Sequence, residues 1–152
     1  MPDVTLTIDG RTVTVPAGTN IVDAARSGEV DVPVFCYHPK MKPVGMCRMC
    51  LVEVWTPMID RATNQPVLDE HGQPKLALMG NKLQAGCVTP VSPGMVVKTV
   101  TDRVQFAQRG QLEFLLTSHP LDCPVCDKGG ECPLQNLTMG WGPGKSRFDY
   151  AD

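Results

Sequence analysis

The chain has 152 residues, of which 42% are hydrophobic and only 5% aromatic, and its formal net charge at pH 7 is −2. This length allows one ordinary domain or two small ones, and the charge predicts binding neither to nucleic acid nor to an anionic membrane. The apolar runs are too short to span a bilayer and no secretory signal opens the chain, so we expect a soluble chain in a reducing compartment, without direct membrane insertion. The 14 Gly and 14 Pro predict many loops, in which metal centres replace part of a missing core.

The first predicted element is a β-hairpin. Residues 4–8 and 11–15 alternate apolar with polar side chains, and Asp9-Gly10 between them is the strongest short-range signal for a hairpin turn. Both segments are therefore predicted as strands of one sheet.

A short helix is predicted next. Thr19 or Asn20 can cap its start, apolar residues follow over 21–25, and Gly28 can end it. A loop over residues 36–50 is then expected, because its prolines and Gly45 exclude a helix.

The rest of the first hundred residues predicts two more strands, at 51–55 and 95–100, separated by an exposed excursion over 56–75. The resulting order is strand, strand, helix, loop, strand, strand. This is the order of a β-grasp, ferredoxin-like α+β sheet, which we assign to residues 1–100.

A second domain is predicted over residues 101–152. A helix is expected over 102–117, with residues 139–152 as a C-terminal linker. The apolar face of the helix is predicted to consist of Val104, Ala107, Leu112, Leu115 and Leu116, flanked by Phe106 and Phe114.

Four possible metal ligands follow this helix within fourteen residues, in the pattern H-x3-C-x2-C-x5-C. They are His119, Cys123, Cys126 and Cys132. Three thiols and one imidazole can hold either a structural zinc ion or a 4Fe–4S cluster, so this segment can form a small helical metal-binding domain by itself.

The other four cysteines have the pattern C-x10-C-x2-C-x36-C. They are Cys36, Cys47, Cys50 and Cys87. The plant-type 2Fe–2S pattern, C-x4-C-x2-C followed by a distant cysteine, has the same order with a shorter first loop. Seven cysteines and His119 fill two four-ligand sites, and the odd number disfavours a disulfide framework. Two zinc sites fit the count equally well, but the long gaps favour iron–sulfur centres.

Together these motifs resemble the N-terminal part of the large iron–sulfur subunit (of the type designated 3 or G) of bacterial NADH:quinone oxidoreductase, respiratory complex I. The resemblance covers nearly the whole chain. It implies a 2Fe–2S cluster on Cys36, Cys47, Cys50 and Cys87, and a 4Fe–4S cluster on His119, Cys123, Cys126 and Cys132.

The resemblance also implies a function: one-electron transfer in the peripheral arm, from NADH and FMN towards quinone. The chain would take part in catalysis only as a subunit of this proton-translocating oxidoreductase, with no catalytic residue or substrate site of its own. The implied partners are the flavin- and NADH-binding subunit and the quinone-side subunits, at the cytoplasmic face of the cell membrane. In the family a third, all-cysteine 4Fe–4S site follows, so we expect a chain ending at Asp152 to be a fragment.

Two alternatives stay open. Related modules occur in NAD-linked hydrogenases, iron-only hydrogenases and some formate dehydrogenases, although the excursion over 56–80 favours the complex I form. A zinc-stabilised structural or interaction domain is the second alternative.

Two expectations concern the surroundings of the sulfur atoms. Backbone amides near Gly45 and Gly129-Gly130 can approach sulfur closely because these residues have no Cβ. Met46 and Met49 lie beside the C-x2-C pair, where each could either shield a centre from water or fill a gap in packing.

Overall fold

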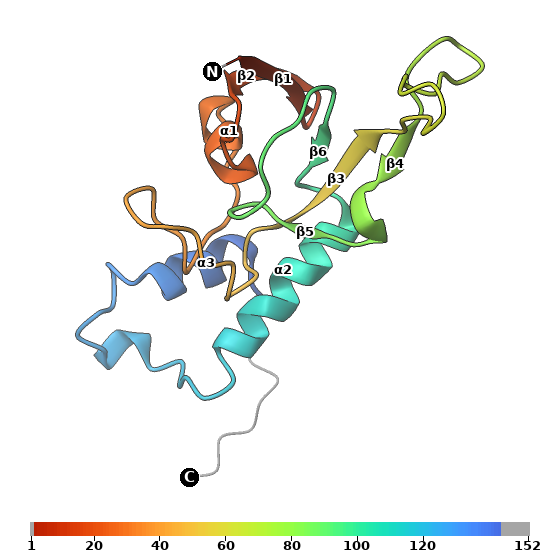
Figure 1. The fold of residues 1–152 in the computed structure, drawn as a ribbon. Helices are drawn as coiled ribbons and strands as arrows, with labels where there is room; N and C mark the ends of the chain where they lie inside the picture. Colours follow the sequence, from red (N-terminus) through yellow and green to blue (C-terminus); the bar gives the residue numbers. More distant parts are fainter. Residues whose placement is uncertain (1, 144–152) are drawn as a thin grey trace.

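The computed structural model describes residues 2–143, and a mixed six-stranded sheet is its central element (Figure 1). The order of the strands is β2-β1-β6-β3-β4, with β5 paired to β3. Only β1 and β6 run parallel among these pairs. The bounds are β1 Asp3–Ile8, β2 Arg11–Pro16, β3 Leu51–Pro57, β4 Leu76–Leu78, β5 Gln84–Ala85 and β6 Val96–Lys98. The predicted β-grasp, ferredoxin-like fold is confirmed.

The β1–β2 hairpin forms as predicted. Asp9 and Gly10 have φ values of 47° and 83°, and positive φ at both central residues is what the two-residue hairpin turn requires. The Asp9 carboxylate also accepts hydrogen bonds from the backbone N–H of Thr99, at 2.8 Å, and from the Thr99 hydroxyl. The turn is therefore fixed to the chain that leaves β6.

Helix α1, Ile21–Ser27, is confirmed together with both of its ends. The side-chain oxygen of Asn20 accepts from the N–H of Asp23 at 2.9 Å, and the N–H of Gly28 closes the last turn. The buried side of the helix packs on the sheet through Ile21, Val22, Ala24 and Ala25.

The exposed excursion is a long extension of the β3–β4 pair. Trp55 of β3 lies opposite Leu78 of β4, and the isolated bridges Ile59–Pro66 and Leu68–Pro74 continue the antiparallel pairing. A single 3₁₀ turn, η1 (Met79–Asn81), then leads towards β5.

Helix α2, Asp102–Leu115, begins at Thr101, whose hydroxyl accepts from the N–H of Val104 at 3.3 Å. The predicted apolar face is confirmed at Val104, Leu112 and the following Leu116, all of which are buried. The sequence did not predict the burial of Gln108, which is only 2% exposed. The two flanking phenylalanines are on the solvent side, with Phe106 81% and Phe114 75% exposed.

The prediction of a linker over 139–152 is wrong at its start, because residues 139–141 form the last turn of helix α3, Pro133–Trp141. Residues 144–152 lie outside the described part of the chain. Pro133 suits a first helical position, and Leu134, Leu137 and Trp141 recur at helical spacing on the side that packs against other residues. The glycines at 140 and 142 favoured the prediction of a linker over that of a helix here.

Two hydrophobic clusters stabilise the described part of the fold. The larger one joins the sheet to α1, and the smaller one consists of Met49, Leu112 and Leu137, from the cysteine loop, α2 and α3. The division into two domains between residues 100 and 101 stays a prediction. Met49, from the first part, packs with Leu112 and Leu137 of the second part. No helix within residues 2–143 is both long and apolar enough to cross a membrane.

Candidate metal centres

The structure brings the first four cysteines together as two pairs. In one pair the N–H of Cys36 donates to the sulfur of Cys47 at 3.4 Å, and the N–H of Cys47 donates back to the sulfur of Cys36 at 3.5 Å. In the other pair the N–H of Cys87 donates to the sulfur of Cys50 at 3.4 Å. Cys47 of the first pair and Cys50 of the second are only three positions apart in the chain, so the two pairs are neighbours.

Pairing between β3 and β5 explains how Cys50 meets Cys87. Leu51, directly after Cys50, lies opposite Ala85 in the antiparallel register. The N–H of Gly86 then donates to the carbonyl of Cys50 at 2.9 Å. The sheet thus places two thiols that are 37 positions apart in the chain at one end of the same strand pair.

Backbone N–H groups surround the sulfur atoms of this site. Burial alone would raise the pKa of Cys36, but hydrogen bonds from the N–H groups of Cys47 and Met46 outweigh it and lower the pKa of this thiol. Burial raises the pKa of Cys47, whose sulfur accepts from the N–H of Met49 at 3.4 Å. Such donors stabilise negative charge on sulfur.

Cys87 is the most perturbed thiol. Burial, and then the neighbouring Cys50, raise the pKa of Cys87 to about 12, while a hydrogen bond from the N–H of Gly45 opposes the shift. The prediction that backbone amides near Gly45 approach sulfur is confirmed by Cys47, whose N–H donates to the sulfur of Cys36 at 3.5 Å.

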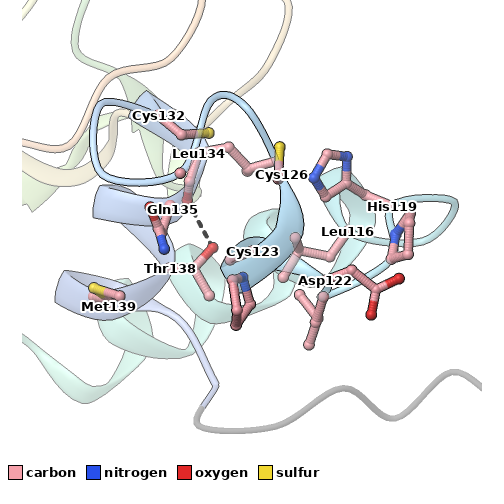
Figure 2. Close-up of a pocket in the computed structure, with 14 residues that line it drawn as sticks. Leu116, His119, Asp122, Cys123, Cys126, Cys132, Leu134, Gln135, Thr138 and Met139 are labelled. Atoms are coloured by element: carbon pink, nitrogen blue, oxygen red, sulfur yellow. Dashed lines mark hydrogen bonds between the residues drawn. The ribbon is translucent and has the colours of Figure 1, made fainter.

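The second set of ligands lies around one cavity of about 440 Å³ (Figure 2). Its predicted ligands His119, Cys123, Cys126 and Cys132 all line this cavity. Figure 2 shows the His119 ring beside the Cys126 side chain, with Cys132 on the other side of Cys126. The surrounding walls are mostly apolar, and they come from the end of α2, from the segment 119–132 and from α3.

Short local elements position these four side chains. The N–H of His119 donates to the carbonyl of Leu116 at 3.1 Å, just beyond α2. Cys123 begins the 3₁₀ turn η2, Cys123–Val125, and Cys126 ends it. Cys132 is the N-cap residue of α3.

The predicted approach of the Gly129-Gly130 amides to sulfur is wrong. The N–H of Gly129 donates to the carbonyl of Cys126 at 3.0 Å, and the N–H of Gly130 donates to the side-chain oxygen of Gln135 at 3.0 Å. Gly129 is instead required for a close crossing of the backbone, because a Cβ there would lie 2.7 Å from the carbonyl oxygen of Cys123.

The arrangement of donors suits polynuclear centres. The first four thiols form two pairs, and a 2Fe–2S centre takes two protein ligands on each iron. The second four donors surround a cavity, which suits a bulky centre better than one tetrahedral ion.

Sequence reasoning missed Tyr37, which fixes the cysteine loop to α1. Its hydroxyl donates to a carboxylate oxygen of Asp23 at 2.6 Å and accepts from the side-chain amide of Asn20 at 3.2 Å. Burial and the hydrogen bond to Asp23 raise the pKa of Tyr37. Nothing in the sequence indicated this contact, which depends on how the loop returns to the helix.

Both parts of the chain are similar in sequence to known proteins. Residues 2–102 match the family described as a 2Fe-2S iron-sulfur cluster binding domain, and residues 108–147 match the NADH-ubiquinone oxidoreductase-G iron-sulfur binding region. The chain is 47% identical over 135 residues to NADH-quinone oxidoreductase subunit 3 of Thermus thermophilus, a match that covers 89% of this chain and 17% of that protein. It is 46% identical over 148 residues to the corresponding NADH-quinone oxidoreductase subunit of Streptomyces coelicolor, covering 96% of this chain and 15% of that protein.

The chain belongs to the family of large iron–sulfur subunits of NADH–quinone oxidoreductase. This membership confirms the resemblance inferred from the cysteine motifs, and it supports iron–sulfur clusters as the cofactors. The relatives are subunits of an oxidoreductase, and the chain spans about a sixth of their length.

The fold of this chain is also similar to that of a hydrogenase chain. An NAD+-reducing [NiFe]-hydrogenase structure superimposes with a TM-score of 0.74 and 28% identity, covering 96% of this chain and 52% of that one.

Proposed function

We propose that this chain carries single electrons through two iron–sulfur centres within an NADH–quinone oxidoreductase, from the NADH and FMN side towards quinone. The observation that carries the proposal is the pairing of Cys36 with Cys47 and of Cys50 with Cys87, because two adjacent thiol pairs match a two-iron centre. Relatives at 46–47% identity are subunits of that oxidoreductase, which supports the choice of complex.

The proposed ligands follow the two donor sets. A 2Fe–2S cluster would be held by Cys36, Cys47, Cys50 and Cys87, and a 4Fe–4S cluster by His119, Cys123, Cys126 and Cys132. When bound, each cluster takes up and releases one electron without making a bond to a substrate.

The contribution of the chain itself is to hold thiolates and to stabilise negative charge. The N–H groups of Met49 and Cys47, which donate to the sulfur atoms of Cys47 and Cys36, would offset part of the charge added on reduction. Cys50 and Cys87 are 2% and 1% exposed, so water is largely excluded from that pair. No residue needs to act as an acid, base or nucleophile, and we propose that substrate sites lie on other subunits.

The partners proposed for this function are the flavin- and NADH-binding subunit and the quinone-side subunits of the peripheral arm. The chain would then be cytoplasmic and held at the inner face of the cell membrane through them. Proton translocation would belong to the whole complex.

A second candidate function is the same electron transfer within an NAD-linked hydrogenase. The observation that favours it is the hydrogenase structure with a TM-score of 0.74. Its 28% identity is well below the 46–47% of the oxidoreductase subunits, so the oxidoreductase assignment is better supported.

The test is chemical analysis of the 152-residue chain reconstituted without oxygen, with EPR after reduction. We expect roughly six irons and six sulfides per chain and two distinct EPR signals, as one 2Fe–2S and one 4Fe–4S centre require. Cys87→Ser should remove one signal and Cys126→Ser the other, each serving as the control for its counterpart. About two zinc ions with no sulfide would refute electron transfer and indicate a structural module.

A further inference from the structure

Met49 lies between two proposed ligands of the first centre, and its side chain packs against the helical segment that carries the second site. It is 0% exposed and packs with Leu112 of α2 and Leu137 of α3, in a cluster separate from the core of the sheet. Its backbone N–H meanwhile donates to the sulfur of Cys47 at 3.4 Å. One residue thus binds the helical segment through its side chain and the ligand sulfur through its backbone.

Helix α3 connects this cluster to the second site. Cys132 caps its start, and Leu134 and Leu137 in its first two turns pack in the cluster that holds Met49. Cys47 itself packs against the same cluster. Figure 1 shows α3 lying beside the loop that carries the first cysteines.

The isolated helix would not form by itself. Nine residues are fewer than the roughly 12–15 that an isolated helix needs in water, so α3 depends on its packing against the rest of the chain. This packing is against Met49 and Leu112, and the proposed four-iron cluster would additionally hold Cys132 at the N-cap position of the helix.

We propose that Met49 is a positioning residue through which α3 holds the loop that carries Cys47. How well α3 is folded would then determine how firmly the first centre is retained. The proposal rests on the proposed function for what is bound, whereas the packing it invokes does not depend on the cluster. Met46, on the other side of Cys47, has no such role, because its side chain is 78% exposed.

The first test compares matched variants of the full 152-residue chain loaded with its clusters. The rate at which a chelator removes iron from the two-iron centre is followed through the EPR signal of that centre. We expect Met49→Ala to raise this rate about tenfold or more, since removing a buried side chain loosens its surroundings. Met46→Ala should stay within about twofold of the parent chain, and Met49→Leu, which conserves volume, should restore a nearly normal rate. Equal rates for Met49→Ala and Met46→Ala would overturn the proposal.

The second test addresses transmission through α3. Leu137→Ala should accelerate iron loss from the two-iron centre, although Leu137 lies 90 positions from Cys47 in the chain, whereas Asn136→Ala on the exposed side of α3 should not. The double variant Met49→Ala/Leu137→Ala should show less than the product of the two single effects, because both residues act through one contact. Independent effects that multiply fully would contradict a shared link.

A metal-free measurement separates this proposal from the proposed function. The rate of alkylation of Cys47, followed by mass spectrometry of peptides, should be higher in Met49→Ala than in Met46→Ala. If the parent chain binds no iron or sulfide, electron transfer fails while this comparison still tests the packing. If Met49→Ala does not fold, as judged by circular dichroism, Leu137→Ala against Asn136→Ala decides in its place; equal alkylation in that pair refutes the link.

Discussion

The N–H of Cys87 donates to the sulfur of Cys50 at 3.4 Å, across 37 positions of the chain. Both thiols are buried. Cys50 directly precedes Leu51 in the chain, and Cys87 lies two positions after Ala85, the residue that pairs with Leu51 between β3 and β5. Two acidic groups held together away from water oppose each other's ionisation, which explains why the shift of Cys87 is so large.

Stability of the metal-free chain should fall at high pH. The ordinary pKa of 9.0 for Cys87 is raised to about 12 by burial and by Cys50. Between these values the folded state keeps a proton that the unfolded state has lost, so the contribution of Cys87 is complete below pH 9 and is lost as pH rises towards 12. The midpoint of urea unfolding, measured across this interval, should decline less steeply in Cys87→Ala. Identical slopes for the two chains would contradict the assignment to Cys87.

Two glycine substitutions should have opposite effects. Gly45 has a φ of 62°, and a Cβ there would lie 3.1 Å from a methyl group of Val88, so Gly45→Ala should destabilise the chain by about 1–2 kcal/mol. Gly110 lies inside α2, and a Cβ added to it would meet nothing within 4 Å, so Gly110→Ala should stabilise the chain by up to about 1 kcal/mol. Urea unfolding of both metal-free variants measures the difference. A loss of stability in Gly110→Ala would show that the helix does not tolerate the methyl group.

Exchange of the proposed imidazole ligand should lower one reduction potential. His119→Cys replaces a neutral ligand with a thiolate, which adds a negative charge to the proposed 4Fe–4S centre and disfavours reduction. A redox titration followed by EPR should show a more negative midpoint for that centre and an unchanged midpoint for the two-iron centre. His119→Ala should perturb the four-iron signal, and an unaltered signal in both variants would exclude His119 as a ligand.

Two positions on α2 should differ sharply in their effect on stability. Leu112 is 0% exposed and Phe114 is 75% exposed. Leu112→Ala should cost about 2–5 kcal/mol of unfolding free energy, because it leaves a cavity between α2, α3 and Met49. Phe114→Ala should change it by no more than about 0.5 kcal/mol. Chemical unfolding of the two variants provides the comparison; similar losses would indicate that Phe114 is covered.

Local signals were sufficient for much of the fold. Asp9-Gly10 predicted the hairpin, since a turn with two positive φ values needs such residues, and Asn20 predicted the start of α1 through its short polar side chain. The spacing of His119, Cys123, Cys126 and Cys132 predicted one four-ligand site, because ligands within fourteen residues lie close together, and the motifs of all seven cysteines predicted the second site and the family.

Other features depended on contacts between distant segments. The linker prediction failed at α3 because Leu134, Leu137 and Trp141 form an apolar side only where α2 and Met49 are present to cover it. Gln108 gave no sign of burial, since a polar side chain is buried or exposed according to what its helix packs against.

By itself, the sequence determined which residues can ligate metal and where the β1–β2 hairpin, helix α1, strand β3 and helix α2 lie, because these depend on residue type and on spacing over a few positions. Only the tertiary structure decided that Cys36 pairs with Cys47 and Cys50 with Cys87, and that the Met49 side chain packs with α2 and α3. Those choices depend on strand register and on the packing of buried side chains, where residues far apart in the chain must fit the same space.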